Sequence, residues 1–392
     1  MEEGQEPGEL PAAVGQALAR LLSHENQISD LIALLAALDS EPLIEAFGLS
    51  GTHCYVEREE LLDKGSGRAD LIVRDESGPM ALLEIKVGAA QHGDQFARYD
   101  SWAKAQTPPA RCYLIGLDEG PLGAPSDWAL SFTLPVLLRR WQASKNPHAA
   151  WLATSAAAVL EGWVTQVDGK IGRATSPIVA DFVTRRIATD LAADRPPGTD
   201  FEARATRTKG GTAMVLAWLP FPGKPRDLGA WLCLDFRSMV RDRPAAPWVL
   251  RLGVEVGIND QVSAAAAMAS AHDLAISLLG ALSCTAVQQT FRRGRQDDLA
   301  AVLRPRARTR DGLRSTPDDV ALKEWRANAL AAKAATKHPV LAHDNLRDGF
   351  RLASLIEVDV AELDRHRLVT LLRGVLRHLE GHARTRWSGQ GV

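Results

Sequence analysis

The chain has 392 residues, of which 46% are hydrophobic and 24% charged, and its formal net charge is −2. These values are typical of a soluble globular protein with ample material for a core, and the length predicts two domains. No run of 18 or more apolar residues occurs, which excludes a membrane-spanning helix. The acidic start lacks a signal-peptide layout and the four cysteines form no CxxC pair, so we expect free thiols and a cytoplasmic location.

The first part of the chain predicts one α/β domain over residues 1–148. Apolar residues at helical spacing and short apolar runs between turns predict its helices and strands. The expected elements are helices at 10–22 and 24–38, a strand at 54–59, a hairpin and helix over 68–104, a buried strand at 111–117, and a strand passing into a helix at 128–141.

Two helices, 149–164 and 176–192, form a predicted connection over residues 149–192. The linker ADRPPGTD then opens a second domain, 193–392, in which four apolar or alternating segments between Gly- and Pro-rich turns predict an antiparallel sheet. Helices at 262–281, 317–336 and 361–380 and a strand at 351–360 complete it. The predicted fold class is therefore α/β for the first domain, followed by an α+β domain with an antiparallel sheet.

Charge is distributed unevenly along the chain. Residues 1–63 carry 2 basic and 13 acidic side chains, whereas residues 291–392 carry 20 basic and 13 acidic ones. The densest basic stretch, 291–314, is a candidate nucleic-acid contact because guanidinium groups suit phosphate oxygens. A solvated surface loop explains it equally well. The candidate contact residues are Arg292, Arg293, Arg295, Arg304, Arg306, Arg308 and Arg310.

The most informative segment is the hairpin that carries Asp70 on its first strand and Glu84 and Lys86 late on its second. If the hairpin is centred on Ser77, Asp70 lies opposite Glu84. Directly opposed strand residues have Cβ atoms roughly 4.5–5.5 Å apart, a span that one divalent cation bridges with two carboxylates. Because side chains alternate, Glu84 and Lys86 share a face. This pattern indicates a metal site, and the alternative is an exposed hairpin end with an ordinary ion pair.

At these positions the sequence resembles the PD-(D/E)XK nuclease superfamily, and within it the RecB-like group. The core motif is an acid on one strand and (D/E)-x-K on the next, here Asp70 and Glu84-Ile85-Lys86. The RecB-like variant adds Q-x-x-x-Y on the following helix, matched by Gln95 and Tyr99, which share a helix face. Ala69 stands in place of the proline of the motif.

The resemblance implies a restriction-endonuclease-like mixed sheet flanked by helices. It also implies that Asp70, Glu84 and the carbonyl of Ile85 bind Mg²⁺ or Mn²⁺, while Lys86 positions or deprotonates the water. Glu25 resembles an acid that the first helix contributes in several such nucleases. The alternative is a carboxylate that is favourable at a helix N-terminus.

We therefore expect a metal-dependent nuclease acting on DNA, in a setting that fits defence against foreign DNA. By analogy, the second domain is expected to supply recognition, regulation or dimerisation. A catalytically silent module that binds nucleic acid or protein is the alternative function. RNA stays open as the substrate because metal chemistry does not discriminate the sugar. The expected partner is nucleic acid, not a membrane, and a homodimer is compatible with this interpretation.

Overall fold

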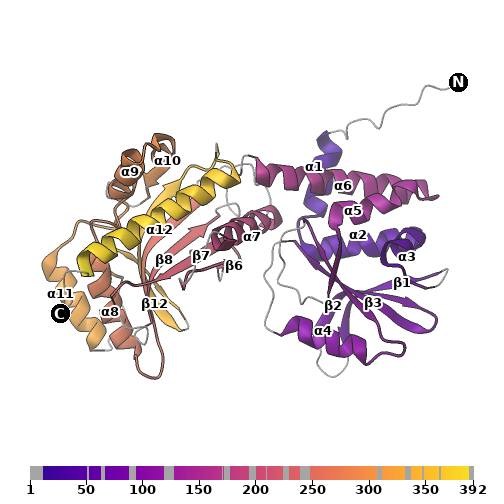
Figure 1. Cartoon of the computed structure of the whole chain (residues 1–392), viewed down its shortest axis with the longest axis horizontal. Coiled ribbons are helices and arrows are strands. Elements are labelled where there is room, and N and C mark those ends of the chain that lie inside the picture. Colours follow the sequence, from indigo (N-terminus) through magenta and orange to yellow (C-terminus); the bar gives the residue numbers. More distant parts are fainter. Residues whose placement is uncertain are drawn as a thin grey trace. The chain divides into compact units, whose positions relative to one another are not determined.

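The computed structural model divides the chain into two compact units (Figure 1). The first unit comprises Met1–Val167 and Ser176–Phe182, and the second comprises Asp168–Thr175 and Val183–Val392. The structure describes residues 12–50, 53–62, 67–87, 94–118, 128–169, 171, 177–193, 200–208, 210–223, 229–238, 248–306, 311–331, 337–346, 348–361 and 363–387.

The first unit contains a five-stranded mixed sheet with the order β1-β2-β3-β4-β5. The first three strands are antiparallel, whereas β3, β4 and β5 are parallel to one another. The mixed sheet flanked by helices that the sequence predicts is confirmed. The strands are β1 (Tyr55–Leu62), β2 (Gly67–Asp75), β3 (Gly78–Lys86), β4 (Arg111–Gly116) and β5 (Ala129–Thr133).

Helices cover both faces of this sheet. Helix α2 (Glu25–Leu38) packs on β1, β2 and β3, and α4 (Gln95–Lys104) lies on the opposite face (Figure 1). Because α4 crosses from β3 to the parallel β4, its buried Phe96 meets the apolar side chains of the sheet. The remaining helices are α1 (Ala12–Leu21), α3 (Glu41–Phe47), α5 (Leu134–Arg139), η2 (Arg140–Ala143) and α6 (Pro147–Asp168).

The β2–β3 hairpin has the register that the sequence predicts at its functional end. Asp75 pairs with Gly78 at the turn, and a bulge between Val73 and Arg74 shifts the register by one residue. Beyond the bulge Leu71 pairs with Leu83, so the next positions on the two strands, Asp70 and Glu84, oppose each other. Without the extra bulge residue the two acids would be out of register.

Strand β1 departs from regular alternation of its side chains at Glu59. This residue has a φ of 47°, a left-handed conformation that interrupts the regular alternation of side chains. As a result Glu57 and Glu60, not Glu57 and Glu59, both bind Arg74, each at 2.5 Å. Glu59 instead accepts a hydrogen bond from the amide of Asn26, at 2.6 Å.

The second unit is built on a seven-stranded antiparallel sheet, as predicted. Its order is β10-β12-β9-β8-β7-β6, and β11 also pairs with β12. Thus β12 pairs along its whole length with β9, and its other edge carries β11 and then β10. The strands are β6 (Glu202–Arg207), β7 (Ala213–Pro220), β8 (Ala230–Arg237), β9 (Trp248–Gly257), β10 (Leu303–Pro305), β11 (Ala342–Asn345) and β12 (Gly349–Val358).

The helices of the second unit support this sheet. Helix α8 packs on β9 and β12, while α12 contacts β8 and also α9. Helix α7 spans the boundary between the two units, and the chain passes from the first to the second at Val183. The helices are α7 (Pro177–Ala193), α8 (Ala264–Ser277), α9 (Cys284–Arg293), α10 (Asp297–Ala301), α11 (Asp319–Leu330) and α12 (Arg365–Trp387).

Two expectations for this unit are corrected. The helix predicted at 317–336 ends at Leu330, one residue after its last buried side chain, Ala329, while residues 332–336 lie outside the described part. The basic stretch 291–314 is not one surface loop, because it contains the end of α9, all of α10 and all of β10. Within the described residues, no helix is long and apolar enough to cross a membrane, and all four cysteines are free thiols.

Candidate active site

The hairpin and the following helix bring Asp70, Glu84 and Lys86 together on one side of the first unit's sheet. Glu84 is 1% exposed, and its Oε1 lies 2.6 Å from the Nζ of Lys86. The main-chain N–H of Ile85 donates to Asp70 Oδ2 at 2.8 Å, so the carboxylate is held against β3. The apolar side chain of Ile85 is fully buried in the core. Ligation by its carbonyl stays a prediction.

The carboxylates of this site carry an uncompensated negative charge. Burial, and then the neighbouring charge of Asp70, raise the pKa of Glu84 to about 7. Burial likewise raises the pKa of Asp70, against the opposing effects of the Ile85 N–H and Lys86. Burial by itself lowers the pKa of Lys86, but the adjacent Glu84 reverses that effect and raises it. The lysine is therefore cationic, and one cation does not neutralise the acids around it.

Gln95 and Tyr99, one helical turn apart on α4, attach this helix to the site. The amide Nε2 of Gln95 donates to Glu84 Oε1 and to the hydroxyl of Tyr99, both at 2.8 Å. The Tyr99 hydroxyl in turn donates to the main-chain carbonyl of Arg68, next to the start of β2. The two side chains thus fix the orientation of Glu84 and tie α4 to the strand that carries Asp70.

Glu25 joins the same site from the first residue of α2. Its Oε1 accepts the main-chain N–H of Val87, directly after β3, at 2.7 Å. Its charge acts on the pKa values of Asp70, Glu84 and Lys86, so it is close to all three. We call Glu25, Asp70, Glu84 and Lys86 the active-site cluster. It contains three acids and one base.

The residues present fit a hard divalent cation. Glu84 Oε2 and Gln95 Oε1 are buried and accept no hydrogen bond, although buried oxygens in proteins are normally satisfied. A cation held by Asp70 and Glu84 would occupy the free lone pairs and offset the excess negative charge. Within the described residues, no group of three or more His, Cys, Asp or Glu side chains is placed to hold a metal ion by itself. Mg²⁺ needs no such group, because it usually keeps several waters.

The predicted nucleic-acid-binding arginines all belong to the second unit. Arg292 and Arg293 form the last turn of α9, and Arg295 follows it. Arg304 lies on β10, and Arg306 directly follows that strand. Arg308 and Arg310 lie outside the described residues.

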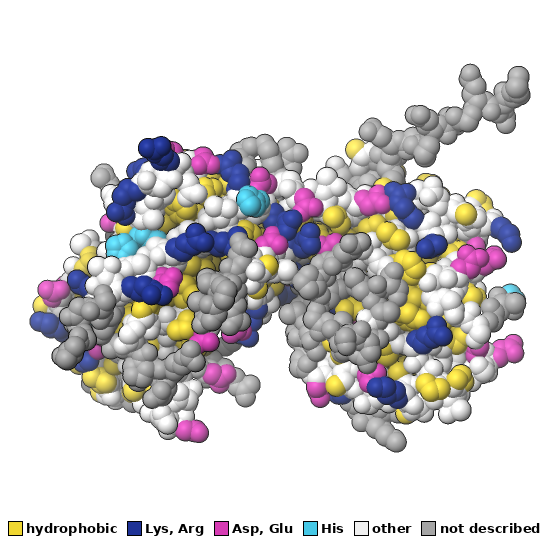
Figure 2. Space-filling model, viewed as in Figure 1, with side chains coloured by type: hydrophobic (Ala, Val, Ile, Leu, Met, Phe, Trp, Pro, Cys, Tyr) yellow, Lys and Arg dark blue, Asp and Glu magenta, His cyan; other side chains and the backbone are white. Residues whose placement is uncertain are grey.

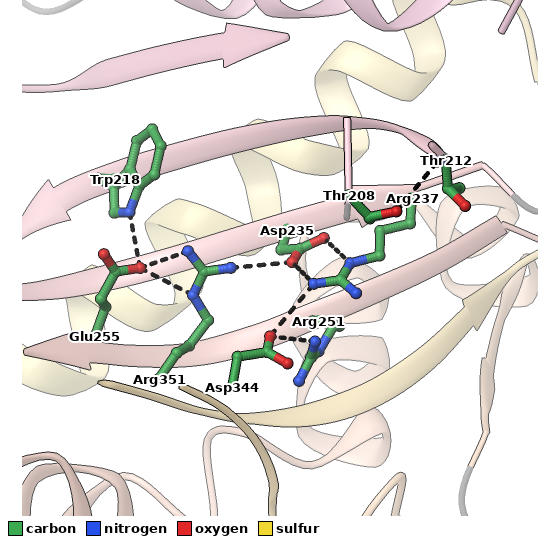
Figure 3. A network of polar contacts seen from close by, with 9 residues as sticks. All are labelled: Thr208, Thr212, Trp218, Asp235, Arg237, Arg251, Glu255, Asp344 and Arg351. Atoms are coloured by element: carbon green, nitrogen blue, oxygen red, sulfur yellow. Dashed lines mark hydrogen bonds and ion pairs between the residues drawn. The ribbon is translucent and has the colours of Figure 1, made fainter. Parts of the chain in front are cut away.

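A second buried polar cluster, on the sheet of the second unit, was not expected from the sequence (Figure 3). Arg351 on β12 donates to Glu255 Oε2 at 2.9 and 2.5 Å and to Asp235 Oδ2 at 3.0 Å. Arg237 Nε donates to Asp235 Oδ1 at 2.6 Å and its Nη2 to Asp344 Oδ2 at 3.3 Å. We call this chain of alternating charges the sheet network. Its members are Asp235, Arg237, Arg251, Glu255, Asp344 and Arg351.

The network is set into the sheet with little exposure of its central members. Asp235 is fully buried and Arg351 is 3% exposed. Trp218 closes one end of the network by donating its indole N–H to Glu255 at 3.1 Å. The sequence does carry a signal for this cluster. Charged residues recur at every second or fourth position of otherwise apolar strands, as Arg251 and Glu255 do in β9.

Comparison with known proteins identifies the region that contains most of the active-site cluster. Residues 28–127 match a family model described as PD-(D/E)XK nuclease superfamily. The chain matches no curated protein and no solved structure. The match includes Asp70, Glu84, Lys86, Gln95 and Tyr99, and confirms the resemblance that the sequence motifs indicate.

Proposed function

Because residues 28–127 belong to the PD-(D/E)XK nuclease superfamily, we propose that the chain is a metal-dependent nuclease that hydrolyses phosphodiester bonds of DNA. The observation that carries this proposal is the charge excess of the active-site cluster. Three carboxylates surround one lysine, and a buried oxygen of Glu84 has no hydrogen-bond partner. Keeping such a cluster buried costs stability, and a structural ion pair would not need the additional acids.

Each residue of the cluster then has a distinct task. Asp70 and Glu84 would hold Mg²⁺ or Mn²⁺, and Glu25 would add negative charge beside them. When bound, the cation neutralises charge on the phosphate and lowers the pKa of a bound water. Lys86, held 2.6 Å from Glu84, orients the attacking water and stabilises the charge that develops on the phosphate. Gln95 keeps Glu84 in the orientation that the cation requires.

The test is incubation of the purified full chain with supercoiled plasmid, linear duplex, single-stranded DNA and RNA, with Mg²⁺, with Mn²⁺ and with EDTA. We expect metal-dependent cleavage of DNA that Glu84→Gln abolishes. Asp75→Asn is the matched control, because this acid lies in the turn of the same hairpin, where it accepts hydrogen bonds from Ser77 and Gly78.

The substrate panel also separates the alternatives. Cleavage of RNA alone would keep the mechanism and overturn the assignment of DNA. Binding of nucleic acid without any cleavage would favour the catalytically silent module. A role in defence against foreign DNA predicts that expression of the wild-type chain, but not of Glu84→Gln, lowers the plating efficiency of phage.

A further inference from the structure

The last turn of α9 carries a compact group of exposed cations in the second unit. Arg292, Arg293 and Arg295 are all exposed, and none of the three forms an ion pair within the described residues. Arg293 makes one local contact, from Nη2 to the hydroxyl of Thr290 at 3.3 Å. We call these three arginines the α9 cations. Their guanidinium groups are thus available to a partner from solution.

Arg295 occupies a backbone position that disfavours its own side chain. Its φ is 57°, and its N–H donates to the carbonyl of Arg292 at 3.0 Å, which closes the end of α9. Glycine is the usual residue in this left-handed position after a helix, and the preceding residue, Gly294, is not in it. An exposed arginine that costs stability at its own position indicates that its charge serves a function.

The end of α9, which carries Arg292 and Arg293, is fixed by packing against α12. Phe291, in the same turn, is 2% exposed and packs directly over Gly374 of α12. A Cβ atom at Gly374 would lie 2.5 Å from Cε1 of Phe291, so only glycine allows this close approach. Val287 and Cys284 continue the buried side of α9. Because the helix is already fixed by this packing, binding of a ligand does not have to order the backbone that carries Arg292 and Arg293.

The arginines at β10 differ from the α9 cations because acids oppose them. Arg304 lies 3.7 Å from Asp359, and Arg306 lies 3.9 Å from Glu357 at the end of β12. These exposed pairs add little stability, but they cancel the local charge. Between residues 291 and 306, the basic stretch therefore contains one charge-compensated group and one uncompensated group.

The acids that follow the α9 cations in the chain do not balance their charge. Asp297 and Asp298 open the neighbouring α10, but Asp298 is bound by Arg367 of α12. Figure 2 shows Lys and Arg side chains gathered over α9 and α12 of this unit. The excess of positive charge suits a polyanion.

We infer that the α9 cations bind the phosphate backbone of DNA, whereas Arg304 and Arg306 do not. This inference rests on the proposed nuclease function, which makes nucleic acid the polyanion that this chain meets. Guanidinium groups bind phosphate oxygens bidentately, and each such contact releases counterions from the DNA. Three contacts of this kind position a duplex without reading its sequence.

The experiment is a salt titration of duplex DNA binding by the full chain in Ca²⁺, used to support binding without turnover. We compare the wild type with a triple variant, Arg292→Ala, Arg293→Ala and Arg295→Ala, and with the matched double variant Arg304→Ala and Arg306→Ala. The triple variant should flatten the slope of log K against log salt by roughly 2–3. The double variant should leave the slope unchanged.

One substitution at Arg295 distinguishes the effect of its charge on DNA binding from its effect on the stability of the second unit. Arg295→Gly should raise the Tm of the second unit by about 2 °C, because glycine suits the left-handed position. The same variant should flatten the salt slope by about one, because one phosphate contact is lost. A gain in stability together with weaker binding would support the inference, since damage to the fold lowers both.

The experiment distinguishes a failure of the DNA-binding inference from a failure of the proposed nuclease activity. Equal slopes for the wild type and the triple variant would overturn the inference even if the wild type cleaves DNA. A flatter slope in the triple variant would support it even if no variant cleaves, and only the proposed activity would then be wrong. Equal weakening by the double variant would overturn the distinction between the two groups. Binding of anionic phosphatidylserine vesicles, but not of DNA, would identify a membrane surface instead.

Discussion

The active-site cluster and the sheet network are both buried and polar, but they differ in charge balance. The active-site cluster holds three acids and one base, whereas the sheet network alternates three acids with three arginines. The pKa values of the buried carboxyl groups in the two clusters are shifted in opposite directions as a result. Burial raises the pKa of Glu84 and nothing offsets it fully. Burial acts in the same direction on Asp344, but Arg251 and Arg237 hold its pKa below the usual value.

The comparison teaches how to distinguish a binding site from a structural support when both contain buried charges. A balanced chain of ion pairs is complete in itself, and the removal of one member leaves an unpaired charge behind. An unbalanced group is incomplete and gains from a cation of opposite charge. We therefore expect opposite effects on stability when an acid is removed from the active-site cluster and when an arginine is removed from the sheet network.

Arg351→Met should have the largest effect on stability. The substitution leaves Glu255 and Asp235 buried beside a neutral side chain, which costs about 3–5 kcal/mol of unfolding free energy. Arg326→Met is the control, because Arg326 pairs with Asp273 on the surface, at 2.6 Å, and exposed pairs contribute about 1 kcal/mol or less. Denaturant unfolding followed by circular dichroism measures both variants. Equal losses would mean that the sheet network does not support the second unit.

Removal of the lysine from the active-site cluster should impair catalysis most of all. Lys86→Met should lower kcat by roughly a hundredfold or more, which corresponds to about 3 kcal/mol of transition-state stabilisation. Because the substitution leaves Glu84 and the neighbouring acids without their cation, the metal-free mutant should also unfold more easily than the wild type, and Mg²⁺ should reduce this difference. Plasmid cleavage under saturating Mg²⁺ gives the rate. If Lys86→Met kept full activity, the lysine would have no part in the reaction, but the carboxylates would keep theirs.

The arrangement of Asp70, Glu84, Gln95 and Tyr99 could be predicted from the sequence because it depends on local structure. The opposition of Asp70 and Glu84 follows from one hairpin, and Gln95 and Tyr99 follow from one turn of helix. For Glu25 the sequence leaves two interpretations open, an acid of the site or a carboxylate that is favourable at a helix N-terminus. The reason is that its contact with Val87 joins residues 62 positions apart. Only the packing of α2 on the sheet brings these two residues together.

The sheet network could not be predicted for the same reason. Arg351 and Asp235 are 116 positions apart, and they meet because β12 inserts beside β9, which pairs with β8. Strand order of this kind depends on the packing of the whole unit, so the charged positions in the apolar strands indicate buried charges but not which of them pair. The basic stretch shows the converse case, in which residues that are close in sequence are separated by the fold. Arg295 and Arg304 are close in sequence, but α10 folds between them and places them on different elements.

The pH dependence of the unfolding free energy provides a further test of the difference between the active-site cluster and the sheet network. The pKa of Glu84 is about 7 in the folded chain and about 4.5 when unfolded. The folded state thus keeps its proton where the unfolded state has lost it, so metal-free stability falls as pH rises from 4.5 to 7. Glu84→Gln should recover up to about 3 kcal/mol at pH 8 in EDTA and much less at pH 4.5.

The control for this measurement is Glu45→Gln, an exposed acid on α3. It should change stability little at either pH, because its charge is solvated in both states. Saturating Mg²⁺ should stabilise the wild type at pH 8 and leave Glu84→Gln nearly unaffected. If Glu84→Gln gained no stability at pH 8, the carboxylate would not be under electrostatic stress, and the contrast with the sheet network would fail.

Gln95→Ala should have the smallest effect, because this residue acts through Glu84 and not on the substrate. Loss of its hydrogen bond to Glu84 removes a group that favours the ionised carboxylate, so the pKa of Glu84 should rise further. We expect a roughly tenfold loss of rate at pH 7, about 1.4 kcal/mol, that higher pH or more Mg²⁺ largely restores. Gln106→Ala, which removes an amide bound to the end of the same helix at Trp102, is the control and should leave the pH profile unchanged. A loss of rate that is equal at every pH would show that Gln95 only packs α4 against the sheet, because a residue that orients and polarises Glu84 must shift the pH at which the cluster becomes charged.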